Sequence, residues 1–393
     1  EFLLHELHLQ IGNFNLLSHG GENLRMIEFI NDGLMTIFFL LVGLEIKREL
    51  LVGELSSFRK AALPFIAACG GMLFPVIVYM SICPPGSAGS QGLAIPMATD
   101  IAFSLGVLSL LGSRVPLSLK IFLTAFAVVD DIGGILVIAL FYSSHVSYGY
   151  ILIAALLYVL LYFIGKRGTT NKIFFLVIGV VIWYLFLQSG IHSTISGVIL
   201  AFVIPAKPRL YVGKYIEHIR HTIAGFPVVE SGSIVLTNEQ IAKLKEVESA
   251  SDRVISPLQS LEDNLHGAVN YLILPLFAFV NAGVVFSGGG ELVGSVGMAV
   301  AAGLLFGKFA GIYFFTWLAI KIKLTPMPPG MTWKNLSGIA LLGGIGFTVS
   351  LFIANLSFGA NYPVLLNQAK FGVLSGTILS GLLGYIVLRI VLP

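Results

Sequence analysis

The sequence predicts an all-α integral membrane protein, and its composition carries most of that prediction. Hydrophobic residues make up 56% of the 393 residues and charged residues only 11%, a balance that fits no soluble globular protein. The 44 glycines and 29 phenylalanines suit helices packed in lipid. A net charge of +3 provides no clustered basic face, which excludes nucleic acid as a partner. The two cysteines, Cys69 and Cys83, are too few for a disulfide framework and are expected to pack as small hydrophobic residues.

Eleven apolar runs are candidates to cross a bilayer, which takes about 20 such residues. They are continuous rather than alternating, which predicts helices and not a barrel. The run 191–205 is short. The run 94–111 carries Thr99-Asp100 in its middle, and the run 335–358 carries a glycine cluster at Gly343. Short or interrupted helices of this kind are used at transporter sites. The runs are 30–50, 60–83, 94–111, 116–142, 148–165, 172–188, 191–205, 267–286, 295–320, 335–358 and 368–391.

Lysine and arginine predict the orientation of these spans. All lysines and arginines except Arg25, Lys308 and Lys370 lie in every second loop or at the span ends next to those loops. The positive-inside rule places these loops in the cytoplasm. Eleven spans that end inside require residues 1–26 to start on the outer side. We therefore expect that a first helix has been cut away or removed by processing. A cleaved signal peptide is the alternative. The membrane regions are then 27–205 and 266–393.

The segment 206–265 is predicted to be a charged cytoplasmic insertion, since it holds seven basic and eight acidic residues. Thr237 with Gln240 has the form of a capping box, and Ile241, Leu244 and Val247 follow at helical spacing. One short amphipathic helix is expected there. The segment is either a regulatory or partner-binding element or a solvated linker.

Four ionisable residues lie in the middle of predicted spans: Asp100, Asp130, Asp131 and Lys308. Each costs about 2.5–3.5 kcal/mol to insert, so it needs a partner, a cavity or a function. Neighbouring residues on a helix point about 100° apart, so one of Asp130 and Asp131 can meet Lys308 while the other faces a cavity. A carboxylate without a partner there can exchange a proton for a small hard cation. The alternative for the ion pair is a purely structural role in orienting helices.

At these residues the chain resembles a known family. The strings Ala94 to Phe103 (AIPMATDIAF) and Leu119 to Gly133 (LKIFLTAFAVVDDIG) are similar to those of the NhaA family of Na⁺/H⁺ antiporters. Further similar strings follow in order along nearly the whole chain, apart from the insertion and the absent first helix. They are Phe38 to Leu50, Ser189 to His192, Tyr271 to Gly283, Gly307-Lys308 and Gly343 to Phe352.

The resemblance implies a bundle of inverted repeats, with eleven spans present of an expected twelve. The repeats would be the spans at 60–142 and 295–391, and two broken helices would cross at the midplane. Asp130 and Asp131 would carry Na⁺ or Li⁺ and protons, Thr99 and Asp100 would line the crossing, and Lys308 would pair with Asp130. Asp100 and Lys308 would also compensate the charges at the ends of the half-helices.

The resemblance also implies a pH response, at His192, Glu262, His266, Glu45, Arg48 and Glu49. His192 titrates in the right range but is as compatible with a packing role. For Glu45 and Arg48, three residues apart, the alternative is a local salt bridge. The insertion that precedes Glu262 departs from the family pattern and leaves the pH threshold open.

The sequence therefore predicts a secondary transporter of the bacterial inner membrane and not an enzyme. Its C-terminus would be cytoplasmic, and it would exchange Na⁺ or Li⁺ for protons electrogenically, with lipid around it, no cofactor, and a possible homodimer contact through residues 1–25. Two alternatives stay open. A Na⁺-coupled organic-solute symporter would have a large apolar pocket beside Asp131, and an intramembrane aspartyl protease would share a proton between two carboxylates.

Overall fold

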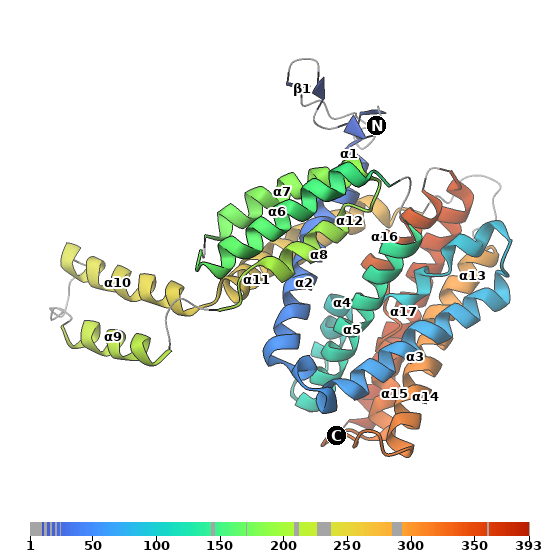
Figure 1. Ribbon diagram of the computed structural model, residues 1–393. Helices are drawn as coiled ribbons and strands as arrows, with labels where there is room; N and C mark the ends of the chain where they lie inside the picture. Colours follow the sequence, from blue (N-terminus) through green and yellow to red (C-terminus); the bar gives the residue numbers. More distant parts are fainter. Residues whose placement is uncertain are drawn as a thin grey trace.

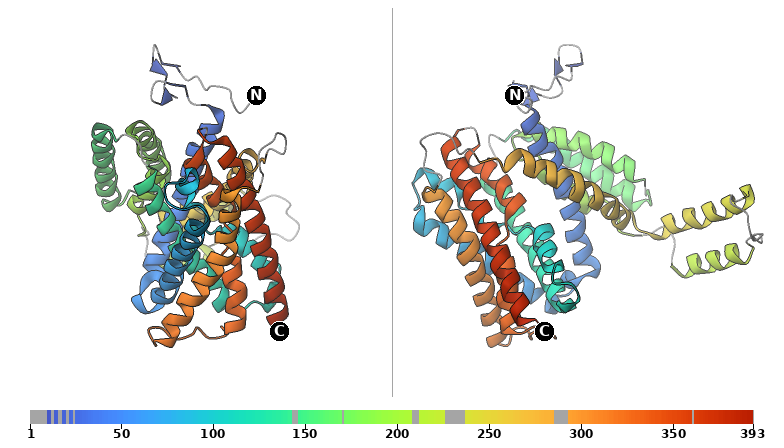
Figure 2. Two further views of the ribbon diagram at one scale, coloured as in Figure 1. Left: turned by 90° about the vertical axis from the view of Figure 1, so that its right-hand side faces the viewer. Right: turned by 180° about the vertical axis from the view of Figure 1, so that it is seen from behind.

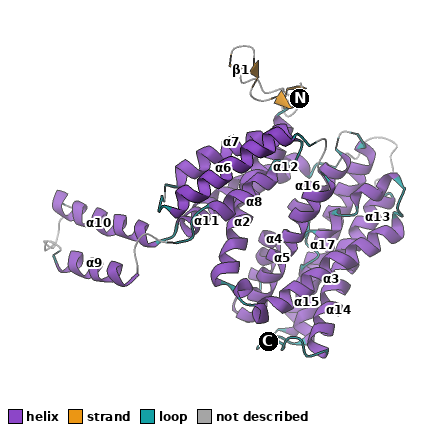
Figure 3. Ribbon diagram, in the orientation of Figure 1, coloured by secondary structure: helices purple, strands orange, loops and turns teal. Residues whose placement is uncertain are grey.

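Helices dominate the structure, a computed structural model that describes residues 10–11, 14–15, 18–19, 22–23, 25–142, 146–169, 171–207, 212–225, 237–284, 293–359 and 361–392 (Figure 3). The strands in these parts are two residues long and form two antiparallel pairs: β1 (Gln10–Ile11) with β2 (Phe14–Asn15), and β3 (Ser18–His19) with β4 (Glu22–Asn23). The strands and the C-terminus lie at opposite ends of the helical bundle (Figure 1). The predicted all-α class is confirmed.

Seven helical segments of the described chain are long and apolar enough to cross a membrane, and each corresponds to a predicted run. Two of them contain a π-helical turn. The segments are α1 (Met26–Phe29) with η2 (Ile30–Leu34) and α2 (Met35–Val52); α3 (Phe58–Ile82); α5 (Leu117–Phe141); α6 (Tyr148–Lys166); α7 (Lys172–Ser189); α13 (Ser295–Ala302) with η8 (Gly303–Gly307) and α14 (Lys308–Lys321); and α17 (Pro363–Val391). Short 3₁₀ turns η3 (Glu54–Ser56) and η6 (Gly112–Arg114) lie in the connections.

Two further spans are broken, as the sequence predicted. The first consists of η4 (Ala88–Gly92), η5 (Ile95–Met97) and α4 (Ile101–Ser109), bent by 46°. The second consists of α15 (Trp333–Leu342) and α16 (Phe347–Phe358), bent by 44°. Each bent pair stands between two long helices in sequence, α3 and α5 for the first, and α14 and α17 for the second. The repeated order of helix, broken helix and helix agrees with the two predicted repeats.

The remaining predicted runs, 191–205 and 267–286, are helical but shorter. They correspond to α8 (Thr194–Val203) and to the end of a continuous helix made of α11 (Pro257–Ala268), η7 (Val269–Ile273) and α12 (Leu274–Asn281). By length and hydropathy the described chain offers seven spans, or nine with the bent pairs. The count of eleven therefore stays a prediction.

The predicted insertion, 206–265, contains two complete helices and most of α11 rather than one helix. The capping box at Thr237 is confirmed, because its backbone N–H donates to Gln240 Oε1 (2.9 Å) and Gln240 N–H donates back to its hydroxyl (3.3 Å). It begins α10 (Asn238–Val254), but a second helix, α9 (Val212–Ala224), packs beside it. The expectation of a single helix was wrong because Tyr215, Ile219 and Ile223 already repeat at helical spacing. The hairpin projects sideways from the bundle (Figure 2).

Two apolar cores of the bundle lie on either side of the four charged residues Asp100, Asp130, Asp131 and Lys308. The first core includes Tyr79 and Phe352, and the second includes Phe126 and Leu336. In each of three segments, the charged residue lies between a residue of the first core and a residue of the second. Asp130 and Asp131 lie between Ile138 and Phe126, Lys308 lies between Leu304 and Ile312, and Asp100 lies between Ala98 and Leu108. The four charges therefore share one level of the bundle, away from both ends.

Glycines bring α3 and α14 into backbone contact and thereby position Lys308. A Cβ atom on Gly70 would lie closer than 3.0 Å to the carbonyl oxygen of Gly311, and one on Gly311 equally close to that of Gly70. Only glycine permits this approach, which is common where membrane helices cross. Lys308 begins α14 one turn before Gly311. The crossing therefore sets the depth at which its ammonium enters the bundle.

Gly311→Val is expected to destabilise the protein by at least about 3 kcal/mol. This is the upper end of the usual overpacking cost, because the obstacle is backbone that cannot rotate away. Gly149→Val is the matched control, since a Cβ at Gly149 meets nothing within 4 Å. Chemical unfolding in detergent, followed for both variants, checks the difference. Equal stability of the two variants would contradict the packing argument.

Candidate functional site

The two helix breaks lie against each other and satisfy each other's polar groups. The backbone N–H of Asp100 donates to the carbonyl of Ile345 (2.6 Å), and the Thr99 hydroxyl donates to the carbonyl of Gly343 (2.8 Å). A third bond runs from the Ser104 hydroxyl to the carbonyl of Leu342 (3.1 Å). Unwound backbone at membrane depth is tolerated only where protein groups or a cavity satisfy it. The breaks in the two repeats thus depend on one another.

Asp100 caps the N-termini of two half-helices at once. It is the N-cap of α4, where its Oδ1 accepts from Phe103 N–H (3.1 Å). Its Oδ2 accepts from the backbone N–H (3.1 Å) and the hydroxyl (2.5 Å) of Thr348, in the first turn of α16. Both helix ends carry partial positive charge, so one buried carboxylate compensates the two together. This geometry matches the charge-compensating role that the sequence predicts for Asp100.

Asp100→Leu is expected to destabilise the protein by at least about 3 kcal/mol, because buried donors on both half-helices lose their acceptor. Asp100→Asn keeps one acceptor oxygen and should lose less. Asp263→Leu, at an exposed position on α11, serves as the control and should change stability by less than about 0.5 kcal/mol. Unfolding in detergent measures all three variants. An Asp100→Leu variant as stable as the control would refute the double-cap interpretation.

Asp130 and Lys308 form a buried ion pair. The Lys308 ammonium donates to Asp130 Oδ2 (2.6 Å), and both side chains are inaccessible to solvent. The ammonium also lies 5.5 Å from the centre of the Phe126 ring, within cation–π range. The other oxygen, Asp130 Oδ1, is buried without a hydrogen-bond partner among the described residues. The pair therefore leaves one carboxylate oxygen available at the centre of the bundle.

Asp131 differs from its neighbour in having no hydrogen-bond or ion-pair partner among the described residues. It is buried, with 6% of its surface exposed, and the described residues offer its side chain no hydrogen bond or ion pair. As the next residue on α5 it points about 100° around the helix axis from Asp130. The structure thus divides the two carboxylates as the helix geometry predicts.

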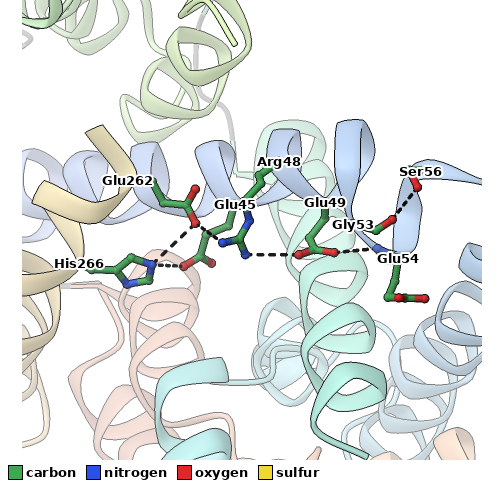
Figure 4. Close-up of polar contacts among 8 residues, drawn as sticks. All are labelled: Glu45, Arg48, Glu49, Gly53, Glu54, Ser56, Glu262 and His266. Carbon is green, nitrogen blue, oxygen red and sulfur yellow. Dashed lines mark hydrogen bonds and ion pairs between the residues drawn. The ribbon is translucent and has the colours of Figure 1, made fainter. Parts of the chain in front are cut away.

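Glu45, Arg48, Glu49, Glu262 and His266 come together where α2 meets α11, and we call them the α2–α11 cluster (Figure 4). Arg48 Nη1 lies 2.9 Å from Glu262 Oε1, and its Nη2 lies 3.3 Å from Glu49 Oε1. His266 Nε2 lies 3.3 Å from Glu45 Oε1 and 3.8 Å from Glu262 Oε1. His266 precedes the predicted span 267–286, and its pKa is raised above its usual range, chiefly by Glu262.

His192, the sixth residue for which the resemblance implies a pH response, does not join this cluster. It precedes α8, with Nε2 at 3.7 Å from Asp32 Oδ1 and Nδ1 at 3.0 Å from the Thr194 hydroxyl. Its ring packs edge-on against Phe352, with 5.4 Å between ring centres. The contacts with Thr194 and Phe352 are compatible with a packing role, and the pH response of His192 stays a prediction.

Sequence reasoning missed three polar residues with clear structural roles. Thr348, which bonds Asp100, carries only the signal of a hydroxyl just after a glycine break. Asp32 and Lys47 lie near the two ends of the first predicted run, 30–50. The insertion cost of a charged residue marks positions at the centre of a span and does not mark these two. Lys47 donates to the carbonyls of Phe202 (2.8 Å) and Ile204, at the C-terminal end of α8. It therefore ties α2 to α8 by binding the negative end of a helix.

Comparison with known proteins identifies the family. The family described as Na⁺/H⁺ antiporter 1 matches residues 2–388. Proteins named Na(+)/H(+) antiporter NhaA are similar along the whole chain: one from Bacteroides fragilis is 81% identical over 100% of this chain and 90% of its own, one from Phocaeicola vulgatus 63% over 100% and 88%, and one from Parabacteroides distasonis 51% over 100% and 88%. The resemblance found in the sequence is confirmed, and neither alternative class is favoured. The chain belongs to the Na⁺/H⁺ antiporter 1 family, a family of multi-pass membrane transporters and not of enzymes.

Proposed function

We propose that this protein extrudes Na⁺ or Li⁺ in exchange for protons by alternating access around Asp130 and Asp131. The observation that carries the proposal is Asp131, a buried carboxylate next to the ion-paired Asp130. In the described part of the chain, Asp131 has no partner and one oxygen of Asp130 makes no hydrogen bond. A buried charge of this kind is costly unless it takes up a proton or binds a cation. The site therefore favours a cycle in which one replaces the other.

The donor set suits a small hard cation. Carboxylate and hydroxyl oxygens are the ligands that such ions prefer, and Asp130 Oδ1, the Asp131 carboxylate and the Thr99 hydroxyl supply them near the two helix breaks. Asp100 is occupied by three donors from the half-helices, so we assign it charge compensation rather than ion binding. The cycle uses the transported ions alone and needs no cofactor.

Exchange of two protons for one cation would move one net charge per cycle. Proton loss from both aspartates on binding of one monovalent ion gives that stoichiometry. The membrane potential then contributes about 2.3 kcal/mol per charge per 100 mV. We infer that the transport is electrogenic and that inward proton flow drives sodium out of the cell.

The cellular setting belongs to the same proposal. Lysine and arginine loops on the side where α17 ends favour a cytoplasmic C-terminus in a bacterial inner membrane. A homodimer through residues 1–25 and a pH response at the α2–α11 cluster and His192 stay predictions. The ion pairs of the α2–α11 cluster support the predicted pH response.

An organic-solute symporter receives less support. A pocket of about 450 Å³ in the described chain is lined by residues that include Gln91, Tyr142 and Ser357, and Asp131 is not one of its lining residues. A solute carried with Na⁺ would need space beside that carboxylate.

Proteoliposomes with an imposed proton gradient, followed with a pH-sensitive dye, test the exchange. Addition of Na⁺ or Li⁺ should collapse the gradient between pH 6 and 9, and addition of K⁺ should not. A gradient that none of the three cations changes, in vesicles shown to contain folded protein, would contradict the proposal. Collapse by Na⁺ only in the presence of an organic solute would favour the symporter instead.

A further inference from the structure

Three side chains of the α2–α11 cluster direct metal-binding atoms at one point. Glu262 and His266 stand four residues apart on one face of α11, and Glu45 faces them from α2 (Figure 4). Their three nearest donor atoms, two carboxylate oxygens and Nε2 of the imidazole, all lie within 4.8 Å of one another. The donors come from two helices, so an ion bound there would join α2 to α11.

Two of the three spacings between these atoms are close to those of a tetrahedral site. Zinc binds imidazole nitrogen and carboxylate oxygen at about 2.0–2.1 Å, which places tetrahedral ligands about 3.3 Å apart. His266 Nε2 lies 3.3 Å from Glu45 Oε1 and 3.8 Å from Glu262 Oε1. The carboxylate oxygens of Glu45 and Glu262 lie within 4.8 Å of each other, so side-chain rotation would have to bring them together by up to about 1.5 Å to complete the geometry.

Glu262 supplies a second and independent indication. Its side chain is only 3% exposed, and its Oε1, the atom that faces His266, makes no hydrogen bond among the described residues. Arg48 Nη1 lies 2.9 Å from this oxygen but outside hydrogen-bond geometry. Buried polar atoms usually make a hydrogen bond, whereas the described residues give Glu262 Oε1 only an ion pair with Arg48. This oxygen therefore has a lone pair that a cation can use.

The position of Arg48 makes it a competitor for any cation at this point. Its guanidinium also pairs with Glu49 Oε1 at 3.3 Å, so it keeps one carboxylate partner if it leaves Glu262. The side chain of His266 is 42% exposed, which gives an ion access from water and leaves a fourth position for a water ligand. The imidazole nitrogen favours a borderline transition-metal ion over Mg²⁺ or Ca²⁺, which prefer oxygen alone.

We propose that Glu45, Glu262 and His266 form a binding site for one Zn²⁺ ion, and that Arg48 opposes its binding by charge. The ion replaces the guanidinium as the positive partner of Glu262, and Arg48 turns to Glu49. This site is separate from the aspartate pair and does not depend on the proposed transport cycle, because binding is measured without transport.

Binding of Zn²⁺ alone to the purified full chain, without a histidine tag, tests the site by competition with a chromophoric chelator. The expected result is one ion per chain. His266→Ala and Glu45→Gln should each weaken binding by roughly 100-fold, since losing a ligand costs more than losing a group behind it. Arg48→Gln should tighten binding on the order of 10-fold, because it removes a positive charge next to the ion.

His218→Ala is the matched control. His218 Nε2 lies 3.5 Å from Glu246 Oε1, a distance similar to that between His266 and Glu45. The described residues place no third metal-binding atom beside this pair, so His218→Ala should leave Zn²⁺ binding unchanged. Thermal unfolding without metal checks that each variant is folded, and Zn²⁺ should raise the unfolding temperature of the wild type but not of His266→Ala. Unchanged binding in His266→Ala, or equal weakening in His218→Ala, would overturn the proposal.

Discussion

Asp131→Asn is expected to abolish Na⁺-dependent proton movement while leaving the protein folded. Asparagine has nearly the same shape but neither titrates nor balances the charge of a cation, so both halves of the exchange are lost. Stability should stay equal or rise, because the variant removes a buried carboxylate for which the described residues provide no partner. Proteoliposome transport and unfolding in detergent, measured on the same preparation, check the two expectations together.

Asp263→Asn makes the same chemical change at an exposed position on α11 and is the control for Asp131→Asn. It should retain transport and stability. Turnover near the wild-type level in Asp131→Asn would remove Asp131 from the transport site. Loss of folding together with loss of transport would show instead that its carboxylate is structural.

Lys308→Met is expected to destabilise the protein by about 3–5 kcal/mol, the usual cost of breaking a buried ion pair from one side. The methionine fills a similar volume but leaves the Asp130 carboxylate buried without its ammonium. Lys308→Met combined with Asp130→Asn removes both charges and should recover most of the loss. Unfolding curves of the single and double variants measure the difference. A double variant no more stable than Lys308→Met would show that the lysine acts through packing and not through charge.

The charged centre of the site could be predicted because of where its residues lie in the sequence. Asp100, Asp130, Asp131 and Lys308 stand in the middle of apolar runs, and their insertion cost alone marks them. The helix breaks could be predicted as well: the polar pair Thr99-Asp100 indicates the first break, and the clustered glycines at Gly343 indicate the second. Both signals are local, which explains why one sequence suffices to find them.

The partners of these residues were harder to predict because they are set by tertiary contacts. Asp100 and Thr348 are 248 positions apart, and only the crossing of the two broken helices brings them together. The same holds for Lys47, whose partners are carbonyls at the end of α8 that have no side-chain signal. For α9 the failure was different, since its apolar spacing was present and was overlooked beside the stronger capping box of α10.

The number of charges moved per cycle under a clamped membrane potential tests the central claim most directly. Proteoliposomes with valinomycin and fixed K⁺ gradients set the potential, while ²²Na⁺ and proton fluxes are followed together. The account predicts two protons for each Na⁺ and a rate that rises when the potential favours proton entry. A one-to-one ratio, or a rate indifferent to the potential, would contradict the assignment of both aspartates as proton carriers.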